Sequence, residues 1–210
     1  MTTTSSTSRA FVSRNDKTDA AQAAALIHKL HSASTPAASG LAYAFSIAIE
    51  SADWNAAHAT GAARTAIAKA RGRSSGIYRR GDADERIDTE GALAELALYS
   101  ALGPVADYCA PLVEYKPSRT GLDLGLGGEH YDIKSMSQSA KLCCINQAQH
   151  FAKKPRGYIC ARIVSERIID VYYVPASVVD GWKVFAGFTP YFADRLPAII
   201  PLPDEEVLEE

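Results

Sequence analysis

The chain has 210 residues, of which 47% are hydrophobic and 22% are charged, close to the usage of ordinary soluble proteins. This composition excludes a wholly disordered chain, and the length suits one compact domain, alone or with an N-terminal extension. The formal net charge of -2 excludes a histone-like protein that binds nucleic acid through bulk charge, although a local basic patch is compatible with it.

Short sequence signals favour a reducing, aqueous compartment. The first residues, MTTTSSTSRAFVSRNDK, lack the apolar segment of a signal peptide, and no run of about 18 apolar residues predicts a membrane span. No pair of cysteines forms a CxxC motif, so we expect small hydrophobic side chains in a reduced interior rather than zinc ligands. The four cysteines are Cys109, Cys143, Cys144 and Cys160. We therefore expect a cytoplasmic protein with no membrane segment.

Residues 1–80 are predicted to form a Ser- and Thr-rich start followed by an Ala-rich helical region. Residues 1–16 are expected to be disordered or loosely attached. Helices are expected over 19–31, 41–52 and 54–70, because Ala, Leu, Gln and Lys carry little helix penalty. We interpret this part as an N-terminal helical extension, either a helical subdomain or a cap on the domain formed by the rest of the chain.

Charge is distributed unevenly around residue 80. The segment between Trp54 and Gly81 contains several Lys and Arg residues and no acidic residue, and the acidic segment GDADERIDTE follows at once. Two interpretations stay open: a solvated helix end beside a neutralising loop, or an arm that contacts nucleic-acid phosphates. For the second interpretation, the expected nucleic-acid-binding residues are Arg71, Arg73, Arg79 and Arg80.

Residues 81–210 are predicted to hold the remaining domain and to end in an acidic tail. Asp88 is a plausible N-cap for a helix that Gly103 and Pro104 end. A strand is expected next, over residues 111–115.

A β-hairpin is the clearest predicted feature of this part. Gly127 and Gly128 lie between the alternating runs 121–126 and 131–136, which is the pattern of a tight hairpin turn. The remaining expected elements are a helix over 145–153 and strands over GYICARIV and IIDVYYV. The order of helix, three strands, helix and two strands predicts an α/β fold with a mixed central sheet flanked by helices.

Four charged residues are placed to form a site on this hairpin. Side chains two apart on a strand share a face, so Asp132 and Lys134 project together. A half-exposed surface ion pair, worth at most about 1 kcal/mol, is the simplest explanation of that pair. Asp123, on the preceding strand, can share a cation with Asp132. Glu95 lies on or beside the apolar face of its helix, where a carboxylate is costly unless it meets a metal, a cation or water.

Such a set of side chains points to metal-assisted hydrolysis of a phosphodiester. Carboxylate oxygens suit Mg²⁺ or Mn²⁺ and leave places for water and a substrate phosphate. A metal there would polarise the phosphoryl oxygen and lower the pKa of a bound water. Lys134 can orient that water or stabilise charge on phosphorus. Gln147 and Gln149, at the start of the next helix, can reach the same region.

Over roughly residues 85–180 the chain resembles the PD-(D/E)XK nuclease superfamily, whose fold is restriction-endonuclease-like, although Leu122 stands where the motif has proline. The resemblance rests on Glu95, Asp123 and the Asp132-Ile133-Lys134 triplet, in the expected succession of elements. It implies that the three carboxylates hold the metal and that Lys134 assists the attacking water. It also implies that a glutamine, Gln149 rather than Gln147, lies near the substrate.

We therefore expect a Mg²⁺- or Mn²⁺-dependent nuclease that acts on DNA, as an endonuclease rather than an exonuclease. RNA stays open as the substrate. The alternative is a nuclease-fold module that binds nucleic acid or assembles with a partner and has no catalytic activity. Cutting both strands of a duplex from one site per chain favours a homodimer.

Overall fold

The structure is a computed structural model, and it describes residues 11–12, 20–32, 40–70, 82–113, 121, 123–185 and 191–196. The four arginines of the predicted nucleic-acid arm, Arg71, Arg73, Arg79 and Arg80, lie outside these residues. So do the predicted boundary at residue 80, most of the Ser- and Thr-rich start and the acidic tail.

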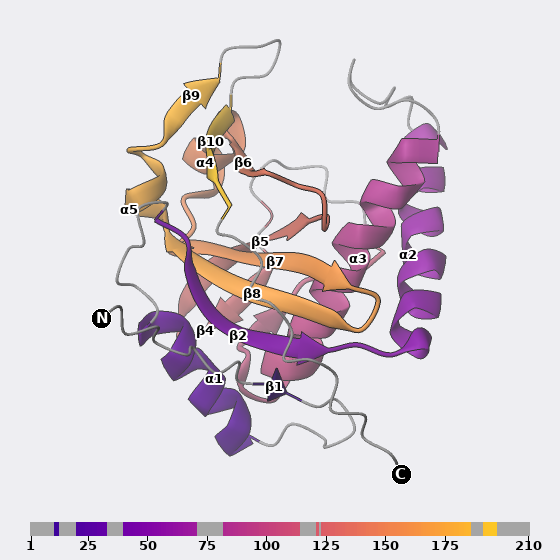
Figure 1. Ribbon diagram of the computed structural model, residues 1–210, viewed down its shortest axis with the longest axis horizontal. Helices are drawn as coiled ribbons and strands as arrows, with labels where there is room; N and C mark the ends of the chain where they lie inside the picture. The colour runs from indigo at the N-terminus through magenta and orange to yellow at the C-terminus, as the bar shows by residue number, and fades with distance from the viewer. Residues whose placement is uncertain are drawn as a thin grey trace, which may run out of the picture.

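A seven-stranded mixed sheet forms the centre of the molecule (Figure 1). Its strands are β1 (Phe11–Val12), β2 (Ala42–Ala48), β3 (Tyr108–Cys109), β4 (Leu124–Leu126), β5 (Glu129–Met136), β7 (Gly157–Ser165) and β8 (Ile168–Pro175). Their spatial order is β1-β2-β8-β7-β5-β4-β3. The β1–β2 and β5–β7 pairs are parallel and the other pairs are antiparallel. The predicted α/β class with a mixed central sheet is thereby confirmed.

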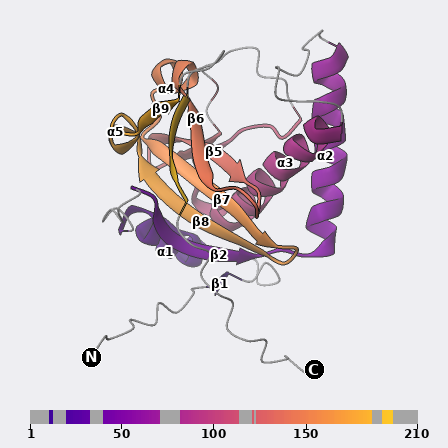
Figure 2. The same ribbon diagram turned by 45° about the horizontal axis from the view of Figure 1, so that its top comes forward.

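Three long helices lie on one side of this sheet: α1 (Ala20–Ser32), α2 (Ser51–Ala70) and α3 (Asp82–Leu102). A short 3-10 helix (Gly103–Val105) follows α3. Helices α1 and α3 bury leucines such as Leu26 and Leu98 against strand residues such as Ile133 and Ile159, so this face carries the main apolar core. Helix α2 packs outside α3 (Figure 2). That contact is close because Gly61 offers no side chain where α2 meets Thr89.

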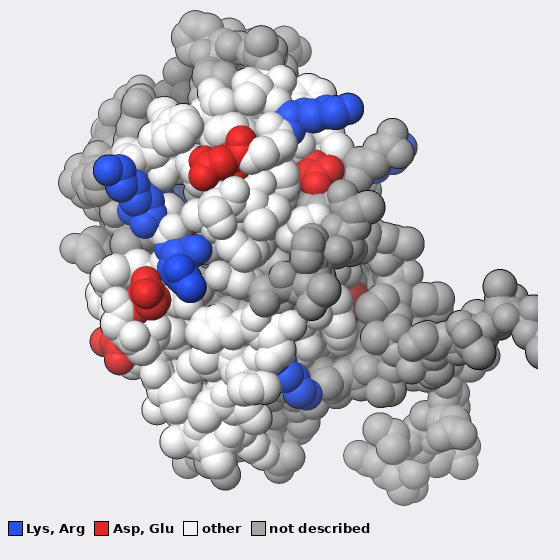
Figure 3. Space-filling view, turned by 90° about the vertical axis from the view of Figure 1, so that its left-hand side faces the viewer, with Lys and Arg blue, Asp and Glu red and all other residues white. Residues whose placement is uncertain are grey.

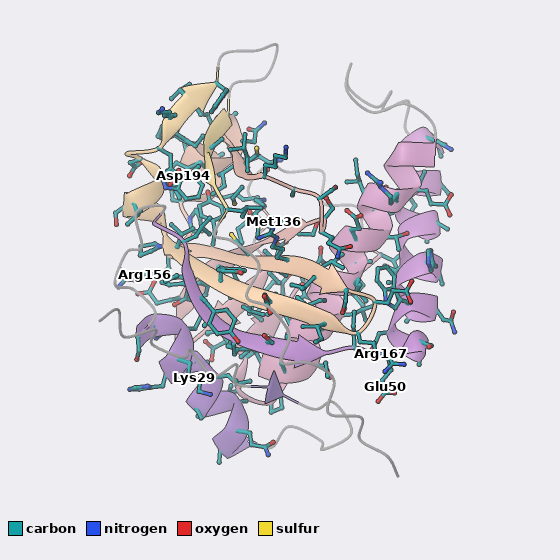
Figure 4. All side chains as sticks on the ribbon, in the orientation of Figure 1. Lys29, Glu50, Met136, Arg156, Arg167 and Asp194 are labelled. Atoms are coloured by element: carbon teal, nitrogen blue, oxygen red, sulfur yellow. The ribbon has the colours of Figure 1, made fainter. Side chains whose placement is uncertain are left out.

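The other face of the central sheet is covered by a smaller layer. A three-stranded sheet, in the order β6-β10-β9, consists of β6 (Leu142–Asn146), β9 (Lys183–Phe185) and β10 (Tyr191–Arg195), and it is joined by α4 (Gln147–Lys153) and α5 (Ala176–Val179). A second apolar cluster fills the space between the layers, with Met136 and Tyr158 on one side and Ile145 and Phe192 on the other. Figure 4 labels Met136 on β5 of the central sheet and Asp194 on β10 of the smaller sheet. These two sheets enclose the cluster.

Most of the predicted elements are present. The first and third predicted helices correspond to α1 and α2, and the helix that Gly103 and Pro104 were expected to end stops at Leu102. The hairpin forms around Gly127 and Gly128 as β4 and β5. The last two predicted strands are β7 and β8.

The predicted helix over 41–52 is wrong, because residues Ala42–Ala48 form strand β2. This strand lies between β1 and β8, where Phe45 and Ile47 are buried in the core. Ser46 lies opposite Asp170 of β8, and its hydroxyl donates to that buried carboxylate at 2.6 Å. Pairing on both sides outweighs the helix propensity of the alanines in this segment.

The predicted N-cap role of Asp88 is also wrong. Helix α3 begins at Asp82, so Asp88 lies inside the helix, where its Oδ2 accepts a hydrogen bond of 2.7 Å from Thr65 Oγ1 of α2. The side chain therefore joins two helices instead of starting one. Sequence reasoning chose Asp88 because it precedes the apolar stretch, but the more polar residues before it are helical as well.

Two further boundaries differ from the prediction. The strand expected over 111–115 is replaced by the two-residue strand β3 at Tyr108–Cys109; residues 111–113 are not in a strand and 114–115 lie outside the described part. The helix expected over 145–153 begins at Gln147, because Ile145 belongs to β6 and the Asn146 side chain caps the helix by accepting from Gln149 N.

Two expectations about the surroundings of the chain can be compared with the structure. Among the described residues, no helix is long and apolar enough to cross a bilayer. Cys143 and Cys160 are buried and free, as expected, and Cys109 is half-buried; Cys144 is exposed, so it does not belong to the interior.

Candidate active site

The β4–β5 hairpin positions Asp123 beside the Asp132-Ile133-Lys134 triplet. Gly127 and Gly128 have φ values of 60° and 78°, which a tight turn of this kind requires and glycine adopts without strain. Asp123, one residue before β4, donates its backbone N–H to the carbonyl of Tyr131 on β5, at 3.2 Å. Its Oδ2 accepts a hydrogen bond of 2.9 Å from the backbone N–H of Ile133. The carboxylate of Asp123 is thereby held against the triplet.

Asp132 and Lys134 project from the same face of β5 and form an ion pair between Oδ2 and Nζ. The Asp132 side chain is only 1% exposed and that of Lys134 is 22% exposed. A buried carboxylate is costly without a cationic partner, so the half-exposed surface pair considered from the sequence does not describe this arrangement. The ammonium group of Lys134 supplies the cationic partner that this buried carboxylate requires.

A second lysine, Lys153, contacts the other oxygen of the same carboxylate. Its Nζ pairs with Asp132 Oδ1, and its side chain is 11% exposed. Lys153 is the last residue of α4, and Gln149 lies one turn earlier, at the i, i+4 spacing that puts two residues on one helix face. Gln147, two residues before, lies on a different face. Sequence reasoning missed Lys153, although its spacing of four residues from Gln149 indicates that the two residues share a helix face.

The charges of the hairpin keep Lys134 protonated. Burial disfavours its ammonium form, but the charges and hydrogen bond of Asp132, together with Asp123, outweigh burial and raise the pKa of Lys134 above its ordinary value. The ammonium group also lies 5.9 Å from the centre of the Tyr158 ring. At neutral pH Lys134 therefore acts as a hydrogen-bond donor and a positive charge, and not as a base.

Glu95 lies on α3, and its carboxylate is held by Arg64 of α2. Two hydrogen bonds of 3.1 and 2.6 Å join the guanidinium to the carboxylate, and Arg64 Nε donates to the carbonyl of Leu112 at 2.5 Å. The Tyr99 hydroxyl donates to the Asp123 carbonyl at 2.9 Å. Burial, followed by the charges of Glu95 and Asp123, raises the pKa of Tyr99. Of the partners expected for Glu95, a metal, a cation or water, the structure shows a cation, the guanidinium of Arg64.

The predicted metal can be judged against this set of side chains. Within the described part of the chain, no three His, Cys, Asp or Glu side chains converge closely enough to hold a metal ion. Mg²⁺, however, is commonly held by one or two carboxylates, with waters and substrate phosphates as its other ligands. Asp123 and Asp132 supply carboxylate oxygens of this kind, and ammonium groups already lie where a cation is needed against Asp132. The donor set fits Mg²⁺ or Mn²⁺, and the roles of the predicted ligands stay predictions.

Helix α4 is anchored to the central sheet by a buried histidine. His150 is hydrogen-bonded through Nδ1 to the Tyr158 hydroxyl at 2.8 Å and through Nε2 to Asp180 Oδ1 at 2.9 Å. Tyr158 of β7 is the register neighbour of Asp132 on β5. The anchor therefore fixes the helix that carries Lys153 next to the strand that carries Asp132.

One side of the molecule shows whether the described basic side chains gather into a patch that could bind nucleic acid. On the side of the molecule seen in Figure 3, Lys and Arg side chains are interspersed with Asp and Glu and form no single basic patch among the described residues. The predicted arm of Arg71, Arg73, Arg79 and Arg80 lies outside the described residues, so its role stays a prediction.

Comparison of the chain with protein-family models, with curated proteins and with solved structures finds no match. The functional conclusion therefore rests on the contacts among Asp123, Asp132, Lys134 and Lys153.

Proposed function

We propose that the protein is a metal-dependent nuclease that hydrolyses phosphodiester bonds of DNA as an endonuclease, with an active site of the PD-(D/E)XK type. The observation that carries the proposal is the meeting of Asp123, Asp132 and Lys134 at the β4–β5 hairpin, with the carboxylate of Asp132 buried between cations. A buried carboxylate with two ammonium partners on a central strand is costly to fold, and a catalytic role is a reason to keep it.

The arrangement of the elements supports the proposal. The resemblance implied a helix, three strands, a helix and two further strands, in a restriction-endonuclease-like sheet. Helix α3, the antiparallel strands β3, β4 and β5, helix α4 and strands β7 and β8 occur in this order, with β7 parallel to β5; strand β6 of the smaller sheet is an additional element between β5 and α4. Strands β1 and β2 extend the sheet on its other side.

The residues divide the reaction between them. Asp123 and Asp132 would hold Mg²⁺ or Mn²⁺; Glu95, which the resemblance implied as a third ligand, is paired with Arg64. When bound, such an ion polarises the phosphoryl oxygen and lowers the pKa of a coordinated water. Lys134, kept as an ammonium by its neighbours, donates a hydrogen bond to the attacking water or to the phosphoryl oxygens and stabilises the negative charge that develops on them. Gln149 is the glutamine that we propose to contact the substrate.

The Asp123→Asn variant tests the proposal with little risk to the fold. An amide oxygen can still accept the hydrogen bond from Ile133 N, so the hairpin keeps its contact while the site loses one negative charge. Cleavage of supercoiled plasmid, linear duplex, single-stranded DNA and matched RNA is measured with Mg²⁺, Mn²⁺ or EDTA. We expect wild-type cleavage of DNA that EDTA abolishes, and a loss of about 100-fold or more in the variant.

Asp107→Asn is the matched control. Asp107 also accepts a backbone N–H of the hairpin, from Gly128 at 2.7 Å, but at the exposed turn rather than at the triplet. It should cleave like the wild type. Full activity of Asp123→Asn would remove the assignment of the site.

A second candidate function, a nuclease-fold module without catalysis, is favoured by one observation. Asp132 is already paired with two lysines and Glu95 with Arg64, so these carboxylates have cationic partners without a metal ion. Calorimetric titration with Mn²⁺ separates the two functions, since the module should show no binding that Asp123→Asn removes. Cleavage of both strands by one site per chain would favour a homodimer. Size-exclusion chromatography with light scattering measures whether the protein is one.

A further inference from the structure

We propose that Lys153 is a substrate-binding residue of this site, whose ammonium group exchanges the Asp132 carboxylate for a backbone phosphate of the nucleic acid. The inference rests on the proposed nuclease function and extends it to a residue that neither the D-x-K motif nor the resemblance assigns.

The charges of the site motivate the exchange. Two carboxylates, Asp123 and Asp132, face two ammonium groups, Lys134 and Lys153, so the cluster is neutral as it stands. Each oxygen of Asp132 already pairs with one lysine. A divalent ion held by the same carboxylates competes with the ammonium groups for these oxygens, and it leaves the site with a surplus of positive charge that favours the departure of one of them.

Of the two lysines, Lys153 is the one whose ammonium group can move away from the Asp132 carboxylate. Lys134 stays near the charge of Asp123 and the ring of Tyr158, and it stands on a central strand. Lys153 ends the short helix α4, and its described ion pair is with Asp132. A lysine side chain has four methylene groups, so its head can move several ångströms while the helix stays anchored by His150.

A phosphodiester is the anion that suits the displaced group. Lys153 is only 11% exposed, and an ammonium group that loses its carboxylate in such a place needs another anion. Charge-assisted hydrogen bonds to phosphate oxygens satisfy it. In the proposed reaction, the substrate brings such an anion to the same cluster.

Lys153→Met tests the inference, because it removes the charge and keeps the apolar stem. In the absence of nucleic acid, Mn²⁺ titrated calorimetrically into the variant should bind several-fold more tightly than to the wild type, since no ammonium group competes for Asp132. On duplex DNA, KM should rise about tenfold with a smaller change in kcat, and the slope of log kcat/KM against log salt should become shallower by about one.

Lys154→Met is the matched control, one residue along the chain. Lys154 is exposed, and its φ of 46° is equally demanding for lysine and methionine. It should leave the Mn²⁺ affinity and the salt slope unchanged. Lys153→Arg, which keeps the charge, should retain the wild-type slope, and it serves as the second variant if Lys153→Met does not fold.

Unchanged Mn²⁺ affinity and salt slope in Lys153→Met, or equal effects of Lys153→Met and Lys154→Met, would overturn the inference while leaving the nuclease function in place. If the wild type shows no metal-dependent cleavage, the proposed function fails and the inference falls with it.

Discussion

Replacement of Asp132 by Asn should destabilise the protein strongly, quite apart from any effect on activity. The substitution keeps the shape of the side chain and removes the charge that two lysines share. Removing one partner of a buried ion pair costs about 3–5 kcal/mol, because the remaining charge is left without compensation. Lys134 and Lys153 are 22% and 11% exposed, so both can turn partly toward water, and we expect the lower end, about 3 kcal/mol.

Urea unfolding followed by circular dichroism measures this loss. With an m-value of about 2 kcal/mol/M, a loss of 3 kcal/mol lowers the midpoint by about 1.5 M. A domain with about 5–15 kcal/mol of stability survives such a change, so the variant should still fold at low urea. A midpoint within about 0.3 M of the wild type, at an unchanged m-value, would refute the view that Asp132 is a buried carboxylate held by both lysines.

The double variant Asp132→Asn/Lys153→Met identifies the source of the loss. If the cost comes from ammonium groups left without a carboxylate, removing one of them recovers part of the stability. The double variant should then be more stable than the sum of the single effects predicts, by a coupling free energy of about 1–3 kcal/mol. Additive effects would mean that the two side chains do not interact.

Two further predictions concern the scaffold. Gly61→Ala should destabilise the protein by about 1–3 kcal/mol in the same urea assay, since a Cβ there would lie 2.5 Å from Thr89 Oγ1 and 2.6 Å from its backbone nitrogen; Gly103→Ala, which meets nothing within 4 Å, is the control, and equal midpoints for the two variants would contradict the close packing of α2 on α3. Burial, aided by the charges of neighbouring tyrosine and glutamate side chains, raises the pKa of Tyr131 to about 12. The pKa of a tyrosine in the unfolded chain is about 10. The neutral phenol therefore stabilises the fold fully below a pH of about 10, and this stabilisation is lost as the pH rises to about 12. Tyr131→Phe, which also loses the 2.8 Å hydrogen bond to His31, should therefore be less stable than the wild type at pH 8, by a margin that narrows toward pH 12; a margin that stays constant with pH would contradict the raised pKa.

The parts of the fold that could be predicted are those that short-range rules determine. The hairpin follows from two adjacent glycines between alternating runs, and the end of α3 follows from Gly103 and Pro104. Once the hairpin is assigned, the proximity of Asp123 to the Asp132–Lys134 pair follows from strand geometry alone. This core of the candidate site was therefore accessible from the sequence.

The parts that could not be predicted depend on contacts between distant segments. Strand β2 looks helical by composition, and only its place between β1 and β8 makes it a strand. The pairing of Glu95 with Arg64 requires the packing of α2 on α3, which no local pattern encodes. Lys153 shares a helix face with Gln149, but its contact with Asp132 depends on how α4 docks on the sheet.

The placement of β2 also bears on how the chain is made. Ser46 and the carboxylate it binds, Asp170, are separated by 124 positions, so during synthesis β2 leaves the ribosome long before β8 exists. Until then the segment AYAFSIA is an apolar strand with no antiparallel neighbour, the kind of sequence that self-associates between nascent chains. Newly synthesised chains should consequently depend on a holdase chaperone, or on slow translation at low temperature, to reach the native state in good yield.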